Sequence, residues 1–125
     1  MIVIDASACA DFVLGTEDAE WVRERVEAEE MLHAPHVVDF EFLSVMRAVR
    51  NRATVIRALG DFYDLRIVRY RAEELAIRVW ELRGHLTAYD ASYVALAEAL
   101  GLRLLTTDRK LARAGGHRAV VEAPT

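Results

Sequence analysis

Four carboxylates in this chain stand where they could share one site. They belong to Asp5, Glu41, Asp90 and Asp108. Asp5 and Asp108 each follow an apolar run that predicts a buried strand. Glu41 and Asp90 fall in the first turns of two predicted helices. Carboxylates packed together repel one another, so we expect the cluster to persist at neutral pH only if a cation neutralises it. With oxygen ligands and no suitably placed His or Cys, Mg²⁺ is expected, with Mn²⁺ as a substitute, rather than Zn²⁺.

Most of these acids also have a purely structural explanation. Asp90 could be the N3 residue of a capping box whose N-cap is Thr87. Asp108 could be an acid that favours the start of a helix. Glu41 could be a favourable charge near a helix N-terminus. Asp5 is harder to explain in this way, because a charge directly after an apolar strand is desolvated unless something at the sheet edge pairs with it. Asp39 is interpreted as the N-cap of its helix rather than as a metal ligand.

Apolar periodicity predicts that strands and helices alternate along the chain. We expect strands at 1–4, 66–70, 102–106 and around 119–121. We expect helices at about 17–30, from 38 onward, at 53–63, 72–83 and 91–100, and a further helix start at 107–108. Segment 33–36, with its His-Ala-Pro-His sequence, is interpreted as a connecting loop, and helix 72–83 is expected to pack on the sheet. Crossovers of this length imply an α/β fold with a parallel sheet covered by helices on both faces. Ligands bind such sheets at the carboxyl ends of the strands, where Asp5 and Asp108 fall.

Length and composition fit one globular domain, residues 1–125. The chain is 54% hydrophobic and 29% charged, which is enough apolar material for one core and argues against disorder. Its single cysteine excludes an internal disulfide and a thiolate metal site. No apolar run approaches the roughly 20 residues of a membrane-spanning helix, and no secretory signal is evident. We therefore expect a soluble, cytoplasmic protein.

The net charge of −4 hides an uneven distribution along the chain. Residues 1–46 carry eleven acids and two bases, whereas residues 47–71 carry seven arginines and two acids. The arginines of the second segment, which include Arg47 and Arg50, could contact phosphate groups. They could equally form a solvated helix face, and the sequence leaves both interpretations open.

Four segments resemble one family in their order and spacing, across nearly the whole chain. They are Val3-Ile-Asp5-Ala-Ser7, Pro35 followed by Asp39-Phe-Glu-Phe-Leu-Ser-Val-Met-Arg47, Thr87-Ala-Tyr-Asp90-Ala-Ser-Tyr-Val-Ala-Leu-Ala97, and Leu105-Thr-Thr-Asp108-Arg-Lys-Leu111. This pattern resembles the PIN-domain ribonucleases, in particular the VapC-like toxins of type II toxin–antitoxin systems. The resemblance implies a single three-layer PIN-like domain with about four to five parallel strands.

The resemblance also assigns roles to individual residues. It places Asp5, Glu41, Asp90 and Asp108 at the family's metal-binding and catalytic positions. Thr106 matches the family's hydroxyl residue and is expected to orient Asp5 or Asp108. Ser7 falls where small hydroxyl residues are common, either in contact with the acidic site or as a local cap.

The implied activity is hydrolysis of RNA phosphodiester bonds by metal-activated water, which leaves a 5′-phosphate and a 3′-hydroxyl. Arg47 and Arg50 then become candidate RNA contacts. The family also implies a homodimer and a cognate antitoxin whose C-terminal segment covers the acidic site. Aromatic side chains would be candidates for the dimer interface if they proved exposed: Trp21, Phe62, Tyr63 and Trp80.

Two other functions compete with this interpretation. A phosphoacceptor receiver domain is also a parallel α/β unit with an acidic Mg²⁺ pocket. That family expects adjacent acids after the first strand, whereas this chain has Asp5-Ala6. A catalytically inactive PIN-like module that binds RNA or a partner is the other alternative, and the complete set of four acids argues against it.

Overall fold

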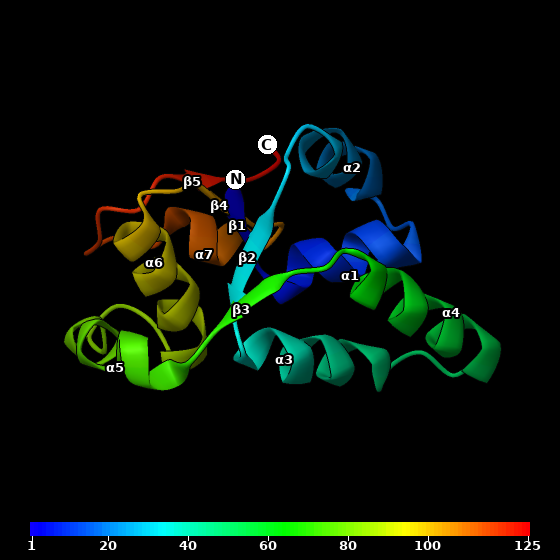
Figure 1. Cartoon of the computed structure of the whole chain (residues 1–125), viewed down its shortest axis with the longest axis horizontal. Coiled ribbons are helices and arrows are strands. Elements are labelled where there is room, and N and C mark those ends of the chain that lie inside the picture. The colour runs from blue at the N-terminus through cyan, green and yellow to red at the C-terminus, as the bar shows by residue number, and fades with distance from the viewer.

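One parallel sheet forms the middle of the molecule. The computed structural model describes all residues 1–125, and its five strands follow the order β3-β2-β1-β4-β5 (Figure 1). Every neighbouring pair of strands is parallel. This confirms the predicted α/β class. The strands are β1 (Ile2–Ile4), β2 (Leu32–Pro35), β3 (Val68–Tyr70), β4 (Leu104–Leu105) and β5 (Val121–Glu122).

Helices cover both faces of the sheet, which gives three layers (Figure 1). One group comprises α1 (Ala6–Leu14), α2 (Ala19–Glu27), α3 (Val37–Met46) and α4 (Arg52–Asp64). The other comprises α5 (Ala72–Glu81), α6 (Ala88–Leu100) and α7 (Arg109–Arg113). None of these helices is long and apolar enough to cross a membrane.

Local sequence explains where the principal helices begin and end. Asn51 and Thr87 each accept a hydrogen bond from a backbone N–H in the first turn of α4 and α6, respectively. Helices α1 and α6 end at Gly15 and Gly101, both in the left-handed conformation that glycine adopts most readily. The core lies between the layers: β1 is wholly buried, and the rings of Phe42 and Phe62 stack 4.0 Å apart.

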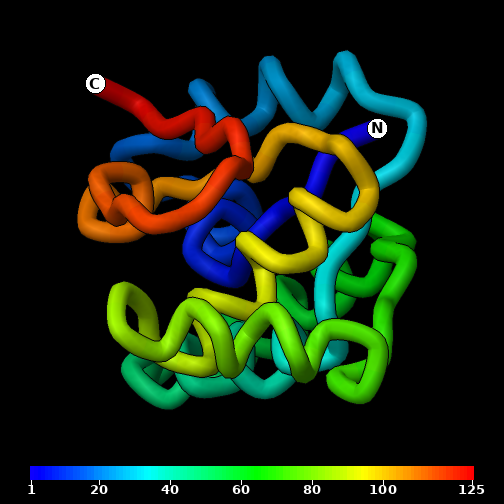
Figure 2. The backbone as a smooth tube through the Cα atoms, turned by 90° about the vertical axis from the view of Figure 1, so that its left-hand side faces the viewer, coloured from blue at the N-terminus to red at the C-terminus, as the bar shows by residue number.

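The strand order reverses at β1, because β2 and β3 lie on one side of it and β4 and β5 on the other. Parallel α/β sheets bind ligands at the carboxyl ends of the strands beside such a switch point. Both chain termini lie at the opposite end of the molecule from α3 and α5 (Figures 1 and 2). The carboxyl ends of β1 and β4 therefore open away from the termini, toward the start of α3.

Two elements were not predicted. Segment 33–36, interpreted as a loop, contains most of β2, and the buried Nδ1 of His33 lies 2.8 Å from the hydroxyl of Tyr70. A four-residue strand with His and Pro in it has too weak a pattern to recognise. Helix α1 begins directly after β1 with no intervening turn residue, because Asp5 itself is its N-cap.

Two further expectations were wrong. Asp39 is not the cap of α3, which begins at Val37; its carboxylate instead binds the Arg69 guanidinium at 2.7 Å, which lowers the pKa of Asp39. Helix α5 packs mainly on α6 rather than on the sheet, and it leaves Ile77 and Trp80 80% and 62% exposed.

Candidate active site

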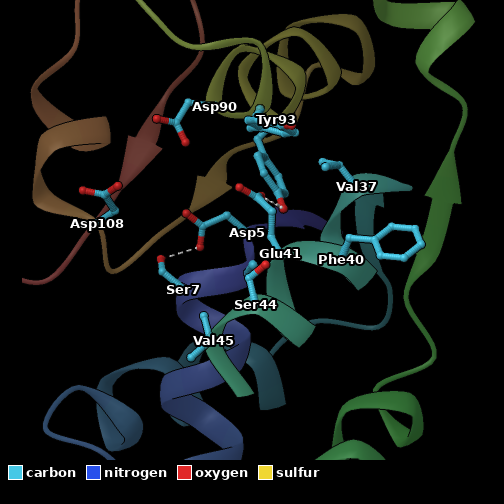
Figure 3. A pocket seen from close by; sticks show the side chains of 12 residues that line it. Asp5, Ser7, Val37, Phe40, Glu41, Ser44, Val45, Asp90, Tyr93 and Asp108 are labelled. Atoms are coloured by element: carbon cyan, nitrogen blue, oxygen red, sulfur yellow. Dashed lines mark hydrogen bonds between the residues drawn. The ribbon is translucent and has the colours of Figure 1, made fainter. Parts of the chain in front are cut away.

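A pocket of about 530 Å³ opens at the carboxyl ends of β1 and β4 (Figure 3). Its walls come from four separate parts of the chain: the start of α1, helix α3, the start of α6 and the start of α7. All four predicted acids line it, and no Arg or Lys does. The twelve lining residues are Asp5, Ala6, Ser7, Val37, Phe40, Glu41, Ser44, Val45, Tyr89, Asp90, Tyr93 and Asp108.

Asp5 is the most buried of the four acids, with 5% of its surface exposed. Its Oδ1 accepts hydrogen bonds from the Ala8 backbone N–H at 2.9 Å and the Ser7 hydroxyl at 2.7 Å. The hydroxyl of Thr106 donates to Oδ2. The carboxylate is thus held from both sides, and Oδ2 keeps acceptor capacity for a further partner.

The two hydroxyls bound to Asp5 also tie the ends of β1 and β4 together. Thr106 Oγ1 accepts the backbone N–H of Asp108 at 2.9 Å, and Ser7 Oγ accepts that of Thr107 at 3.2 Å. Each hydroxyl therefore donates to the Asp5 carboxylate and accepts from the loop after β4. The sequence suggested that Thr106 orients Asp5 or Asp108; its hydroxyl binds the Asp5 carboxylate and the backbone N–H of Asp108.

Asp108 is the N-cap of α7. Its Oδ1 accepts the backbone N–H groups of Lys110 and Leu111 at 2.9 and 3.4 Å, while Oδ2 accepts no hydrogen bond. The explanation of Asp108 as a helix-start acid therefore accounts for Oδ1 only. The same carboxylate that starts the helix also presents a free oxygen to the pocket (Figure 3).

Glu41 has a partner that sequence reasoning missed. The buried hydroxyl of Tyr93 donates to Glu41 Oε1 at 2.6 Å, which leaves Oε2 without a hydrogen bond. Tyr93 follows Asp90 by three residues in α6, a spacing that puts both side chains on one face of the helix. That spacing was the available signal, but an aromatic residue in an apolar helix is usually core.

Matches to known proteins agree with this geometry. The family model described as PIN domain matches residues 2–117. The chain belongs to the PIN-domain family. It is 43% identical over 120 residues to "VapC ribonuclease Mb0985" of Mycobacterium bovis, which covers 92% of this chain and 91% of that protein. It is 35% identical over 127 residues to "Ribonuclease VapC12" of Mycobacterium tuberculosis, with 98% of each covered. These relatives place this PIN domain among the VapC-like toxins, and the match to the PIN family excludes the receiver-domain alternative.

Solved structures share the fold. The crystal structure of PAE2754 from Pyrobaculum aerophilum matches with a TM-score of 0.67 at 26% identity, covering 96% of this chain and 81% of that chain. That of Mycobacterium tuberculosis VapC20, described as a sarcin-ricin loop cleaving toxin, matches with a TM-score of 0.72 at 16% identity, covering 96% and 98%. At that identity the second match supports the fold alone.

The carboxylates of this PIN domain are electrostatically unfavourable as they stand. Burial raises the pKa of Asp5 to about 6, with a smaller contribution from the Asp108 charge and against the hydrogen bonds it accepts. Burial also raises the pKa of Glu41, helped by the charge of Asp90. The pKa of Asp90 is raised by burial and by Asp108. Three acids therefore resist ionisation, and no basic side chain in the pocket compensates them.

The residues present suit a hard divalent cation in chemistry and charge. Carboxylate oxygens are the ligands Mg²⁺ prefers, and the uncompensated negative charge needs a cation. As placed, however, no three acids or histidines are close enough together to hold one ion. To share one metal, the carboxylates would have to lie closer together than they do here.

The candidate RNA-contacting arginines lie outside this pocket. Arg47 and Arg50 are exposed, follow α3, and form no ion pair. Among the other arginines of the basic segment, Arg69 is neutralised by Asp39 and Arg71 by Glu73. The uneven charge of the sequence is thus partly cancelled within the fold.

Proposed function

We propose that this PIN domain is a ribonuclease toxin that hydrolyses RNA phosphodiester bonds with Mg²⁺, for which Mn²⁺ can substitute. One observation carries the proposal: four carboxylates from four separate segments line one pocket that contains no basic side chain. The names of its relatives, which are VapC ribonucleases, support the same activity.

The protein's own part in the reaction is to hold the carboxylates. Thr106 donates to the Asp5 carboxylate and Tyr93 to that of Glu41, so the orientation of each of these two acids is restrained by a hydrogen bond from another segment. Asp5, Glu41, Asp90 and Asp108 would hold the metal. When bound, Mg²⁺ lowers the pKa of water and neutralises charge on the phosphate.

The remaining features of the proposal follow from the family. Cleavage would leave a 5′-phosphate and a 3′-hydroxyl, in the cytoplasm where RNA is available. A cognate antitoxin would inhibit the toxin by covering the pocket, and the active form would be a homodimer. Of the aromatic residues considered for the dimer interface, Tyr63 and Trp80 are exposed, Phe62 is buried and Trp21 is half-buried. Light scattering of the purified protein tests the dimer.

The activity is tested by incubating the purified protein with end-labelled RNA and an excess of Mg²⁺ over protein. Wild type should cleave, and excess EDTA or Asp5→Asn should reduce the rate by at least about a hundredfold, since the lost ligand acts only with the others. Asp61→Asn is the matched control, because Asp61 is an exposed acid of α4 outside the pocket.

Two results would contradict the proposal. Cleavage that survives both EDTA and Asp5→Asn would exclude the metal mechanism. Binding of RNA without cleavage, at any divalent cation, would make the chain the inactive PIN-like module instead. Ligation of adapters to 5′-phosphate ends identifies the products.

A further inference from the structure

Two aromatic side chains stand at the edge of the acidic pocket. Phe40 is 74% exposed and Tyr89 is 61% exposed, yet both line the same cavity as the carboxylates. They come from opposite walls, Phe40 from α3 and Tyr89 from α6. Folding gains little from an aromatic ring left in water, so their exposure is not explained by packing.

The local sequence places each ring beside an acid. Phe40 directly precedes Glu41, and Tyr89 directly precedes Asp90. Successive residues of a helix are about 100° apart around its axis. When the acid faces the pocket, the preceding ring must therefore lie at the rim. Figure 3 shows this for α3, where the Phe40 ring is directed away from the carboxylates.

The other exposed aromatic rings have partners within the protein. Trp80 is covered by the guanidinium of Arg83, 3.7 Å from its ring centre. Tyr63 donates a hydrogen bond to a carboxylate and contacts Phe62 edge-on. Phe40 and Tyr89 have no ring or guanidinium stacked on them, and the Tyr89 hydroxyl makes no hydrogen bond. Only the two rings at the pocket are free for a ligand.

Charge in the pocket restricts how RNA could be held there. No Arg or Lys lines it, so the chain offers no direct salt bridge to a phosphate at this point. A nucleobase has an uncharged face that is not repelled by carboxylates, and it stacks on an aromatic ring regardless of sequence. Bases paired inside a duplex are not available for this contact.

We propose that Phe40 and Tyr89 are positioning residues that stack on the bases on either side of the cleaved phosphate. This rests on the proposed ribonuclease function and names two residues that would hold its substrate. Each stacked base contributes roughly ten- to a hundredfold in affinity. The rings hold the bases, while the carboxylates act on the phosphate between them.

The binding test uses Asp5→Asn protein, to prevent cleavage, and a 12-nucleotide unstructured RNA carrying 2-aminopurine. Phe40→Leu and Tyr89→Leu should each weaken binding by about tenfold and abolish the fluorescence quenching that stacking produces. Phe40→Tyr and Tyr89→Phe, which keep a ring, should bind as the parent does. Tyr63→Leu is the control for loss of an exposed aromatic ring that lines neither this pocket nor the apolar cavity shared by Tyr89 and Trp80, and a duplex of the same sequence should bind weakly to every variant.

The same leucine substitutions in the otherwise wild-type enzyme separate this proposal from the function on which it rests. We expect KM to rise about tenfold with kcat within about twofold, because a contact made equally in substrate and transition state changes KM alone. If wild type cleaves RNA but the leucine variants keep its KM and quenching, the stacking proposal is wrong and the nuclease stands. If wild type cleaves no RNA, both fail. Unchanged RNA affinity with lost inhibition by the antitoxin would assign the rings to that protein and overturn the proposal.

Discussion

Asp5 shows most clearly how a single residue combines structural and chemical demands. It caps α1 and joins β1 to the loop after β4, so the fold needs its oxygens. The fold also buries it, which raises its pKa from 3.8 to about 6. An Asn with its oxygen in the Oδ1 position would still accept the hydrogen bonds from Ala8 and Ser7, and would donate to Thr106 instead of accepting from it, with less electrostatic cost. The charge is therefore kept against stability, as expected of a group that binds a cation.

This conflict predicts that Asp5→Asn stabilises the metal-free protein. Between pH 3.8 and about 6 the folded protein holds the Asp5 proton more tightly than the unfolded chain. Stability therefore falls as pH rises through that interval and stays lower above it. Two pKa units correspond to at most about 3 kcal/mol, so we expect the variant to gain about 1–3 kcal/mol at pH 8 and almost nothing at pH 4.

Urea unfolding in EDTA measures this gain, with Asp61→Asn as the exposed control. Added Mn²⁺ should then stabilise wild type and reduce the advantage of the variant, because a ligand that binds only the folded state raises its stability. An Asp5→Asn protein less stable than wild type at pH 8 would mean that the hydrogen bonds outweigh the cost of burying the charge.

At the scale of elements, one ion pair fastens α5 to α6. Glu98 of α6 is 5% exposed in its side chain and accepts two hydrogen bonds from Arg78 of α5, at 2.7 and 3.1 Å. A third comes from the Arg118 backbone N–H. These partners, Arg78 foremost, lower the pKa of Glu98 to about 2. This ion pair bears on the candidate active site because α6 also carries Tyr89, Asp90 and Tyr93.

We predict that Glu98→Gln lowers the free energy of unfolding by about 2 kcal/mol at pH 7, the usual contribution of hydrogen bonds to a charged group. Because the folded pKa is below the unfolded value of 4.5, this stability is present above pH 4.5 and is lost as pH falls toward 2. The difference between wild type and variant should therefore shrink below pH 4.5 and vanish only near pH 2. Glu81→Gln is the matched control: it removes a 3.4 Å contact to the same Arg78 on the surface and should cost under about 0.5 kcal/mol. Equal losses from the two variants would contradict the assigned role of Glu98.

The elements that the sequence predicted are those with long, regular patterns. Helices α4 and α6 and strand β1 are found within three residues of expectation. Strand β2 was missed because its burial depends on β1 and β3 beside it, and nothing local in His-Ala-Pro signals a strand. That the four acids share one pocket was predicted from their places after strands and in the first turns of helices, together with the family resemblance. Tyr93 was missed because its role depends on a glutamate 52 residues earlier in the chain.

At the scale of the whole molecule, net charge and local charge differ. The net charge is −4, and the pocket itself is acidic. Some arginines pair with neighbouring acids, as Arg71 does with Glu73 at 3.3 Å, whereas Arg52, Arg57 and Arg66 of the same basic segment are exposed and form no ion pair. Arg47 and Arg50 are exposed and unpaired, and they follow Val45, which lines the pocket. If the chain cleaves RNA as proposed, we expect these two arginines to contact the RNA backbone beyond the cleavage site.

We predict that Arg47→Ala combined with Arg50→Ala weakens RNA binding and makes it less dependent on salt. Each phosphate contact with a single strand contributes about 0.7 to the slope of log K against log salt concentration, so the slope should fall by about 1.4. Anisotropy of labelled RNA bound to Asp5→Asn protein, between about 50 and 200 mM salt, measures this. Arg71→Ala is the control, because Arg71 already pairs with Glu73.

An unchanged slope would leave Arg47 and Arg50 as a solvated helix end that does not contact RNA. A reduced slope with unchanged 2-aminopurine quenching would show that the backbone is held by these arginines and the bases by Phe40 and Tyr89, so that the two contacts act separately.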